Sequence, residues 1–378
     1  MALSRSSDTR LSVSVMTHPD RLADAARVQR ALGPHADVRL AVDPVPDGPR
    51  TALRSARLAF AQASGRNATH HLVLQDDVEV PDGLVDSVLQ AIGTHPDAVL
   101  SHFVEWGSRT AVLARWAALT GASAVPVINP YVPTVALSLP TGLAVRLGRF
   151  LDEEARDGEA DDQAVLRFVR TTGTRALVTV PNLVEHLDLP SITGNSGHGA
   201  RRSAGWGATL PPGFDATVLE VPRLMPFFAW NTGTALVLDT ADDVPATQRP
   251  ALECLVEWGA DEERLRRVFT GAVEATSAGR DLFGIVPEEQ FHAAWLTAVA
   301  MGAVQRSQWP ESVADLAVAL KAPDGPAAAA LATLIPGALR VFADVDALLR
   351  HRDDLVSIVS AGMVWGAGNL RVPALPPA

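Results

Sequence analysis

Short apolar runs alternate with longer amphipathic stretches between residues 11 and 187. This alternation is typical of a layered α/β domain, in which helices cover the faces of a sheet. The apolar runs predict strands, and apolar residues three or four positions apart predict helices. We expect strands at 11–16, 38–42, 72–74, 98–103, 135–139 and 176–180, and helices at 21–32, 51–64, 81–92 and 162–170.

The pattern changes near residue 205, where WGATLPPGF has the composition of a linker. Alanine- and leucine-rich helical patterns follow it, with strands expected near 217–221 and 234–238. The sequence therefore predicts two domains, 1–207 and 211–378, of which the second is mainly helical and carries no motif of known chemistry. Its expected helices are 250–258, 261–275, 288–301, 312–320 and 343–349.

Composition narrows the possible functions. The 378 residues are 47% hydrophobic and 20% charged, which is a globular composition. A net charge of −11 argues against broad binding of nucleic acid, because such binding needs a basic surface. Cys254 is the only cysteine, so an internal disulfide and a zinc–thiolate cluster are excluded.

The termini and apolar stretches give no membrane signal. The first ten residues lack the apolar core of a signal peptide, and the most apolar stretch, 326–339, is too short to span a bilayer and contains Pro336. We therefore expect a cytoplasmic protein without a transmembrane segment.

The strongest candidate for chemistry is the acidic turn, Gln75-Asp76-Asp77, which directly follows the apolar run Leu72-Val73-Leu74. In open α/β sheets, ligands bind outside the carboxyl ends of the strands, where this turn would lie. If the backbone stays extended, Gln75 and Asp77 face one ligand and Asp76 faces away. Oxygen ligands of this kind suit Mg²⁺ or Mn²⁺. The alternative is that both aspartates only cap the turn.

The segment HLVLQDDVEV resembles the DXD-type element of glycosyltransferases with the GT-A fold, especially the family 2 and lipooligosaccharide-type enzymes with an acidic E-D-D. The preceding order is similar as well: a strand, THPDR, a second strand ending in Asp43-Pro44, and an arginine-bearing helix. The resemblance covers residues 10–205. Gln75 stands where these families carry a carboxylate, so weaker metal binding is expected, with Asp77 as the main ligand.

This resemblance implies a GT-A-like mixed sheet flanked by helices, followed by the mainly helical second domain. It implies a metal-dependent glycosyltransferase of the hexosyltransferase type, which moves a sugar from a nucleotide-diphosphate donor, expected to be a UDP-sugar, to the hydroxyl of an unidentified acceptor. The implied cofactor is Mn²⁺ or Mg²⁺, held by Gln75, Asp77 and His186.

His186 is included because NLVEH resembles a segment that closes many such domains, where a histidine lies near the metal and diphosphate. The alternative is a histidine hydrogen-bonded at a strand end. The glycine-rich loop after it contains Arg201 and Arg202, whose forked donors match phosphate oxygens. That loop would close over the diphosphate, or else serve as a solvated linker.

Asp161 and Asp162 begin a predicted helix, where acidic residues stabilise the helix dipole. By resemblance, this is also where an inverting enzyme of this fold places the general base that takes the proton of the acceptor hydroxyl. Either aspartate fits that role. The nucleotide pocket would be lined by residues that follow the first three strands, although solvated surface positions remain an alternative for each: Thr17, His18, Arg21, Asp43, Arg54 and Asp76.

Two other functions stay open. A sugar-phosphate nucleotidyltransferase also combines an α/β sheet with acidic metal ligands, but it usually has a glycine-rich loop after the first strand, where this chain has THPDR. A non-catalytic module that binds a sugar or a protein is the second alternative, because Gln75 replaces an acid.

Overall fold

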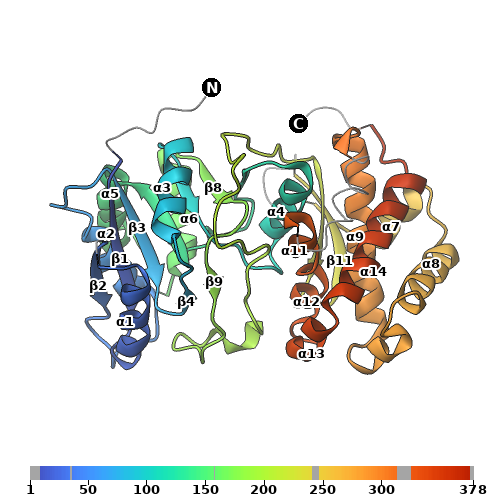
Figure 1. Ribbon diagram of the computed structural model, residues 1–378, viewed down its shortest axis with the longest axis horizontal. Helices are drawn as coiled ribbons and strands as arrows, with labels where there is room; N and C mark the ends of the chain where they lie inside the picture. The colour runs from blue at the N-terminus through green and yellow to red at the C-terminus, as the bar shows by residue number, and fades with distance from the viewer. Residues whose placement is uncertain (1–8, 35, 157, 241–246, 313–324, 375–378) are drawn as a thin grey trace. The chain divides into compact units, whose positions relative to one another are not determined.

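The computed structural model describes residues 9–34, 36–156, 158–240, 247–312 and 325–374 (Figure 1). The chain folds into two compact units that are interleaved in sequence. Unit 1 comprises residues 1–104, 122–196 and 206–218, and unit 2 comprises 105–121, 197–205 and 219–378. The sequence predicts one boundary near 207–211, whereas in the fold the segments 105–121 and 197–205 belong to unit 2.

Unit 1 is built on a mixed sheet of seven strands in the described residues, in the order β2-β1-β3-β7-β5-β8-β6. The β1–β2, β1–β3 and β5–β8 pairs are parallel, and β7 is antiparallel to both β3 and β5. The strands are β1 (Leu11–Thr17), β2 (Asp37–Val42), β3 (His70–Gln75), β5 (Val99–Ser101), β6 (Ala124–Pro126), β7 (Ala136–Pro140) and β8 (Ala176–Thr179). The predicted mixed α/β sheet is confirmed.

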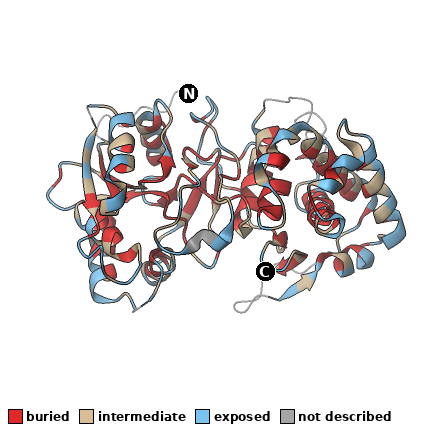
Figure 2. Ribbon diagram, turned by 90° about the horizontal axis from the view of Figure 1, so that it is seen from below, coloured by how far each residue is buried: buried red, intermediate tan, exposed pale blue. Residues whose placement is uncertain are grey.

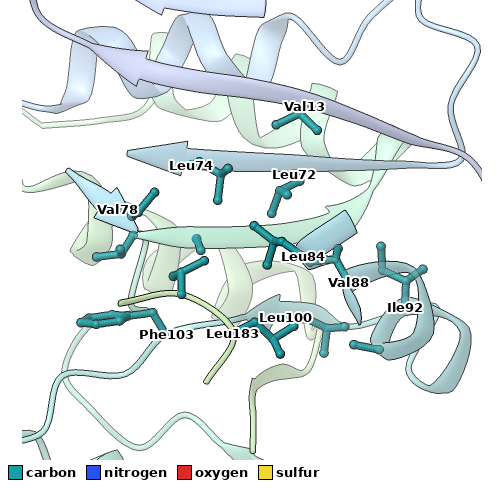
Figure 3. Packing of buried hydrophobic residues seen from close by; sticks show 14 of the residues in the cluster. Val13, Leu72, Leu74, Val78, Leu84, Val88, Ile92, Leu100, Phe103 and Leu183 are labelled. Carbon is teal, nitrogen blue, oxygen red and sulfur yellow. The ribbon is translucent and has the colours of Figure 1, made fainter. Parts of the chain in front are cut away.

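Helices cover both faces of this sheet. Alternate residues of β3 point to opposite faces, so Leu72 and Leu74 join one core and Val73 joins the other. The first core includes residues of α1 (Leu22–Ala31) and α3 (Leu84–Thr94), and Figure 3 shows Leu72, Leu84, Val88 and Ile92 packed together within it. The second core includes α2 (Leu53–Ala61), α5 (Thr141–Glu153) and α6 (Asp161–Thr172). Burial on both faces explains the continuous apolar run of β3.

The strand order reverses beside β1. The chain leaves β1 through the 3₁₀ helix η1 (Pro19–Arg21) and α1 to reach β2 on one side, and then returns through α2 to β3 on the other side. The carboxyl ends of the parallel strands β1 and β3 therefore flank a topological switch point. In doubly wound sheets this is where a ligand-binding crevice forms.

A two-stranded antiparallel ribbon extends from the same edge. It pairs β4 (Val78–Glu79), which follows the acidic turn, with β9 (Glu185–His186). In its register Val78 lies opposite His186. The ribbon thus fixes a segment that comes much later in the chain beside the acidic turn.

Unit 2 combines a three-stranded antiparallel sheet with helices. Its strands are β10 (Leu224–Ala229), β11 (Thr234–Asp239) and β12 (Gln248–Pro250). The longest packed pair of helices is α9 (Glu288–Gln308) and α14 (Arg352–Asn369), whose buried residues appear red in Figure 2. The other helices are α4 (Arg109–Thr120), α7 (Ala251–Glu257), α8 (Glu262–Glu274), α11 (Pro326–Leu331), α12 (Leu334–Leu339) and α13 (Val345–Arg350), with 3₁₀ helices η2 (Asn195–His198) and η3 (Gly279–Gly284).

Several elements differ from the sequence prediction. The helix α4 falls in a stretch expected to be a loop, and its residues are buried on nearly all sides, so it lacks an amphipathic period. The sequence also missed α5, β6 and α14, and β10 begins at Leu224, beyond the strand expected at 217–221. Most of the helix expected at 312–320 lies outside the described residues. Among the described residues, no helix combines the length and apolarity needed to cross a membrane.

Candidate active site

The acidic turn lies at the carboxyl end of β3, between β3 and β4. Both aspartates are buried, with exposed fractions of 7% for Asp76 and 8% for Asp77. Arg21 Nη1 donates to Oδ1 of Asp76 and to Oδ2 of Asp77, at 3.3 Å in each case. The expectation that Asp76 faces away from Asp77 is therefore wrong, because the extended backbone stops at Gln75 and the aspartates form a turn.

Two arginines hold this turn from the β1 side. Arg21 closes η1, shortly after β1, and its Nη2 also donates to the carbonyl oxygen of Pro190. Arg27, on α1, donates to the carbonyl oxygens of Asp76 at 3.1 Å and Val78 at 2.8 Å. The guanidinium of Arg21 thus places one positive charge beside the two carboxylates, and that of Arg27 fixes the backbone that carries them.

The β4–β9 ribbon brings His186 to the acidic turn. Its Nε2 lies 3.4 Å from Oδ2 of Asp77, and the side chain of His186 is almost fully buried. The backbone amide of Leu187 donates to the carbonyl oxygen of Asp77 at 2.7 Å, which fixes the two segments in register. The structure therefore brings together Arg21, Asp76, Asp77 and His186, four of the residues predicted for the site.

Burial dominates the electrostatics of Asp76. It raises the pKa of this carboxyl above its ordinary value, and the neighbouring charge of Asp77 acts in the same direction. Hydrogen bonds from Thr17 and Arg21 and the charge of Arg21 oppose this rise without cancelling it. Two adjacent buried carboxyl groups are costly to ionise, so the turn favours a cation beside it.

A second pair of acids begins α6. Thr134 Oγ1 donates to Oδ2 of Asp161 at 3.0 Å, and the side-chain amide nitrogen of Gln75 lies 3.5 Å from the same hydroxyl. The backbone amide of Gln75 donates to the carbonyl oxygen of Val135, and that of Val132 donates to the carbonyl oxygen of Asp162. The segment 132–135 therefore connects the end of β3 to the start of α6. The contacts of the Gln75 side chain run towards Thr134 rather than towards Asp77.

Asp161 and Asp162 differ in their surroundings. Asp161 is buried and accepts the Thr134 hydrogen bond, and burial raises its pKa. Burial, together with the charge of Asp161, raises the pKa of Asp162 to about 7. Oδ1 of Asp162 is buried and has no hydrogen-bond partner among the described residues. Asp162 is therefore the acid of this pair that exchanges a proton near neutral pH.

The residues predicted after β2 form a separate pair. Arg54 donates through Nε and Nη2 to the two carboxylate oxygens of Asp43, at 2.7 Å each, and this pairing lowers the pKa of Asp43. The backbone amide of Val45 donates to the same carboxylate at 3.0 Å. His18 caps η1 and lies 3.4 Å from the carbonyl oxygen of Pro46. These contacts place Arg54 on Asp43 and not on the acidic turn.

The remaining predicted residues belong to unit 2. Arg201 and Arg202 lie in its 197–205 segment, where Arg202 Nη2 is 3.5 Å from the exposed carboxylate of Asp346. Their role in binding a diphosphate stays a prediction.

Sequence reasoning missed Arg27 and Thr134. Arg27 could have been found as a polar residue on the helix that follows the first strand, although its spacing does not show that it reaches back to the acidic turn. Thr134 is buried in a region expected to be a loop, and only the structure shows its contact with Asp161.

The chain was compared with protein-family models, curated proteins and solved structures. No family model and no curated protein matches the chain. Among solved structures, the chain is similar to the mannosyltransferase PcManGT from Pyrobaculum calidifontis in complex with GDP-Man and Mn²⁺. The match covers 94% of this chain and 88% of that chain, at 16% sequence identity and a TM-score of 0.30.

Proposed function

We propose that this protein is a metal-dependent glycosyltransferase that moves a sugar from a nucleotide-diphosphate donor, with a UDP-sugar as the expected donor, to an acceptor hydroxyl. The observation that carries the proposal is the position of the acidic turn: two buried carboxylates meet Arg21 and His186 at the β1–β3 switch point. Crevices at such points bind nucleotides in doubly wound sheets.

The donor set is compatible with a divalent cation. Asp77 and His186 offer a carboxylate oxygen and an imidazole nitrogen 3.4 Å apart, a combination that suits Mn²⁺. Within the described residues, no group of three or more His, Cys, Asp or Glu side chains could hold a metal ion. Gln75, the third ligand that we propose, carries an amide and is therefore not one of those four residue types. Mg²⁺ and Mn²⁺ commonly complete their coordination with water and substrate phosphates, so two protein ligands suffice.

When bound, the cation would supply positive charge to the departing diphosphate. The protein's own part begins with Arg21, whose guanidinium lies beside both carboxylates and carries donors suited to phosphate oxygens. Asp76 keeps Arg21 in place, and the amide contact between Leu187 and Asp77 keeps His186 beside the turn.

We assign the role of general base to Asp162 and a positioning role to Asp161. A base is most effective when its pKa lies near the working pH, and the pKa of Asp162 is about 7. The carboxylate of Asp162 would take the proton of the acceptor hydroxyl as that oxygen attacks the sugar carbon and the nucleoside diphosphate leaves. Asp161 is already engaged by Thr134.

A donor screen tests the proposal directly. The purified protein is mixed with Mn²⁺ and UDP- or GDP-sugars, and nucleotide release is measured. We expect release from one donor class and its loss in Asp77→Asn. Asp86→Asn, which changes an exposed acid on α3, is the matched control and should retain full activity.

Measuring the binding of Mn²⁺ and nucleotide distinguishes a catalytically inactive protein from a wrong assignment of the site. If Mn²⁺ and UDP together raise the melting temperature but no donor is turned over, the non-catalytic alternative is favoured. If neither nucleotide binds with or without metal, the site assignment is wrong.

A further inference from the structure

Unit 2 contains a buried arginine whose charge has no acidic partner in the described residues. Arg115, on α4, is 3% exposed. Its Nη2 donates to the carbonyl oxygen of Trp106 at 2.6 Å and to Oγ1 of Thr333 at 3.0 Å, and its Nε donates to the carbonyl oxygen of Ala330 and to Oγ1 of Thr333 at 3.3 Å. Burial lowers its pKa to about 9, so the guanidinium remains charged at neutral pH.

A second buried arginine, Arg340, has the acid Glu105 as its partner. Arg340 is 4% exposed, and it pairs with Glu105 at 2.5 Å. Both guanidinium groups contact the segment 105–107, since Arg115 bonds the carbonyl of Trp106 and a Cβ at Gly107 would collide with Nη1 of Arg340. Among the described residues, the charge of Glu105 is thus matched by Arg340, and the charge of Arg115 is balanced only by neutral dipoles.

A cavity of about 20 Å³ adjoins Arg115. Its wall is mostly apolar, with Trp106, Val112 and Phe228 among the lining residues, and the polar residues on it are Ser108, Arg115 and Thr297. One ordered water needs about 10–15 Å³ by the same measure. The space therefore admits a species of roughly water size and excludes a sugar or a nucleotide.

The polar side chains on this wall can all donate hydrogen bonds. Oγ1 of Thr297, a residue 2% exposed, has no hydrogen-bond partner among the described residues. No hydrogen bond of the described structure involves the two N–H groups on Nη1 of Arg115, since its bonds run through Nε and Nη2. The first turn of α4, capped by Ser108, adds the positive end of a helix dipole. A buried positive charge with unused donors requires an acceptor.

From this geometry we infer that the cavity between Arg115 and Thr297 binds a small monovalent anion of the halide class, chloride in practice. A water molecule could accept these hydrogen bonds, but it would leave the guanidinium charge uncompensated. A halide accepts every donor and cancels the charge. The site lies within unit 2 and is independent of the proposed glycosyltransferase activity.

Thermal unfolding tests the inference. Sodium gluconate is replaced stepwise by sodium chloride or bromide at constant ionic strength. A ligand that binds only the folded protein raises the melting temperature, and we expect a saturable rise of roughly 2–4 °C. Arg115→Met should abolish the rise. Because that variant risks misfolding, Thr297→Val, which keeps the side-chain shape, serves as the second variant and should reduce the rise.

The matched control is Ser360→Ala. Ser360, on α14, also carries a buried hydroxyl without a hydrogen-bond partner in the described structure, but it does not line this cavity. This variant should retain the full halide dependence. Crystals grown with bromide should show anomalous density between Arg115 and Thr297. Equal melting temperatures in gluconate and chloride, an unchanged rise in Thr297→Val, or density for water alone would overturn the inference.

Discussion

Two pairs of adjacent aspartates lie in unit 1, and they differ in what lies beside them. Asp76 and Asp77 share the guanidinium of Arg21, whereas the hydrogen-bond partners of Asp161 and Asp162 in the described part of the chain are a hydroxyl and backbone groups. The guanidinium of Arg21 opposes, without cancelling, the rise in pKa that burial imposes on Asp76. Burial raises the pKa of Asp162 to about 7 and makes its proton exchangeable. The same Asp-Asp dipeptide thus has different electrostatic surroundings at the two positions.

The largest effect should come from removing the proton acceptor. Asp162→Asn should lower kcat by about 10²–10⁴-fold, the usual contribution of a general base. Asp161→Asn, the matched variant, should cost less, because an amide oxygen still accepts the hydrogen bond from Thr134. Single-turnover kinetics with the donor identified by the screen measures both. A larger loss of kcat in Asp161→Asn than in Asp162→Asn would indicate that Asp161 is the general base and Asp162 the positioning residue.

Removing the guanidinium of Arg21 should leave the acidic turn, like the start of α6, without a positive charge beside its two aspartates. Arg21→Met leaves two buried carboxylates without their guanidinium, and we expect a loss of about 3–5 kcal/mol in the free energy of unfolding. Chemical denaturation measures this loss. Mn²⁺ should recover more stability in the variant than in the wild-type protein. If Mn²⁺ stabilises neither protein, Asp77 is not a metal ligand.

The pH dependence of stability tests the raised pKa of Asp162. The pKa of Asp162 in the folded protein is about 7, against an ordinary value of 3.8, so the folded state binds more protons between these values. Stability should therefore fall as pH rises from about 4 to about 7, and this fall should be smaller in Asp162→Asn. Turnover has the opposite sign, because the base works deprotonated, and should rise through pH 7. Denaturation midpoints and kcat/KM, each measured from mildly acidic to mildly alkaline pH, give both profiles.

The smallest expected change concerns Thr134. Thr134→Val removes the hydroxyl that donates to Asp161 and leaves a buried acceptor unsatisfied, which should cost about 1–3 kcal/mol. The pKa of Asp161 should rise further, since that hydrogen bond lowers it. Thermal unfolding reports the cost, and carboxyl NMR reports the pKa. Thr141→Val, which loses a hydrogen bond to the backbone of Ala68 elsewhere in the same unit, is a matched control that should leave the Asp161 pKa unchanged.

Much of the sheet follows from local pattern. The run Leu72-Val73-Leu74 predicts a doubly buried strand, and Gln75-Asp76-Asp77 predicts a polar group at its end, because both signals lie within neighbouring residues. The meeting of Asp77 with His186 depends on the β4–β9 ribbon, whose two-residue strands are too short to leave a periodic pattern. The sequence suggests that meeting only through a family resemblance.

The different surroundings of the two aspartate pairs could not be predicted locally. Whether Asp76 or Asp162 has a guanidinium beside it depends on where the fold places Arg21. The separation of these residues along the sequence does not indicate which aspartate Arg21 reaches. Helix α4 could not be predicted from local pattern either. Its residues are buried on nearly all sides, so its sequence lacks the alternation of apolar and polar positions that marks a helix, and Arg115 lies in the middle of it.

The interleaving of the two units limits how the protein can be divided. Helix α4 comes from the middle of the unit 1 sequence, yet it packs on α11 and β10 of unit 2. A chain cut between residues 207 and 211 would leave Arg115 and Trp116 of α4 on a fragment that lacks their surroundings, while the other fragment would have an open core. Because each unit draws on separate stretches of the chain, no single cut yields either unit intact, and neither can be exchanged as one continuous segment.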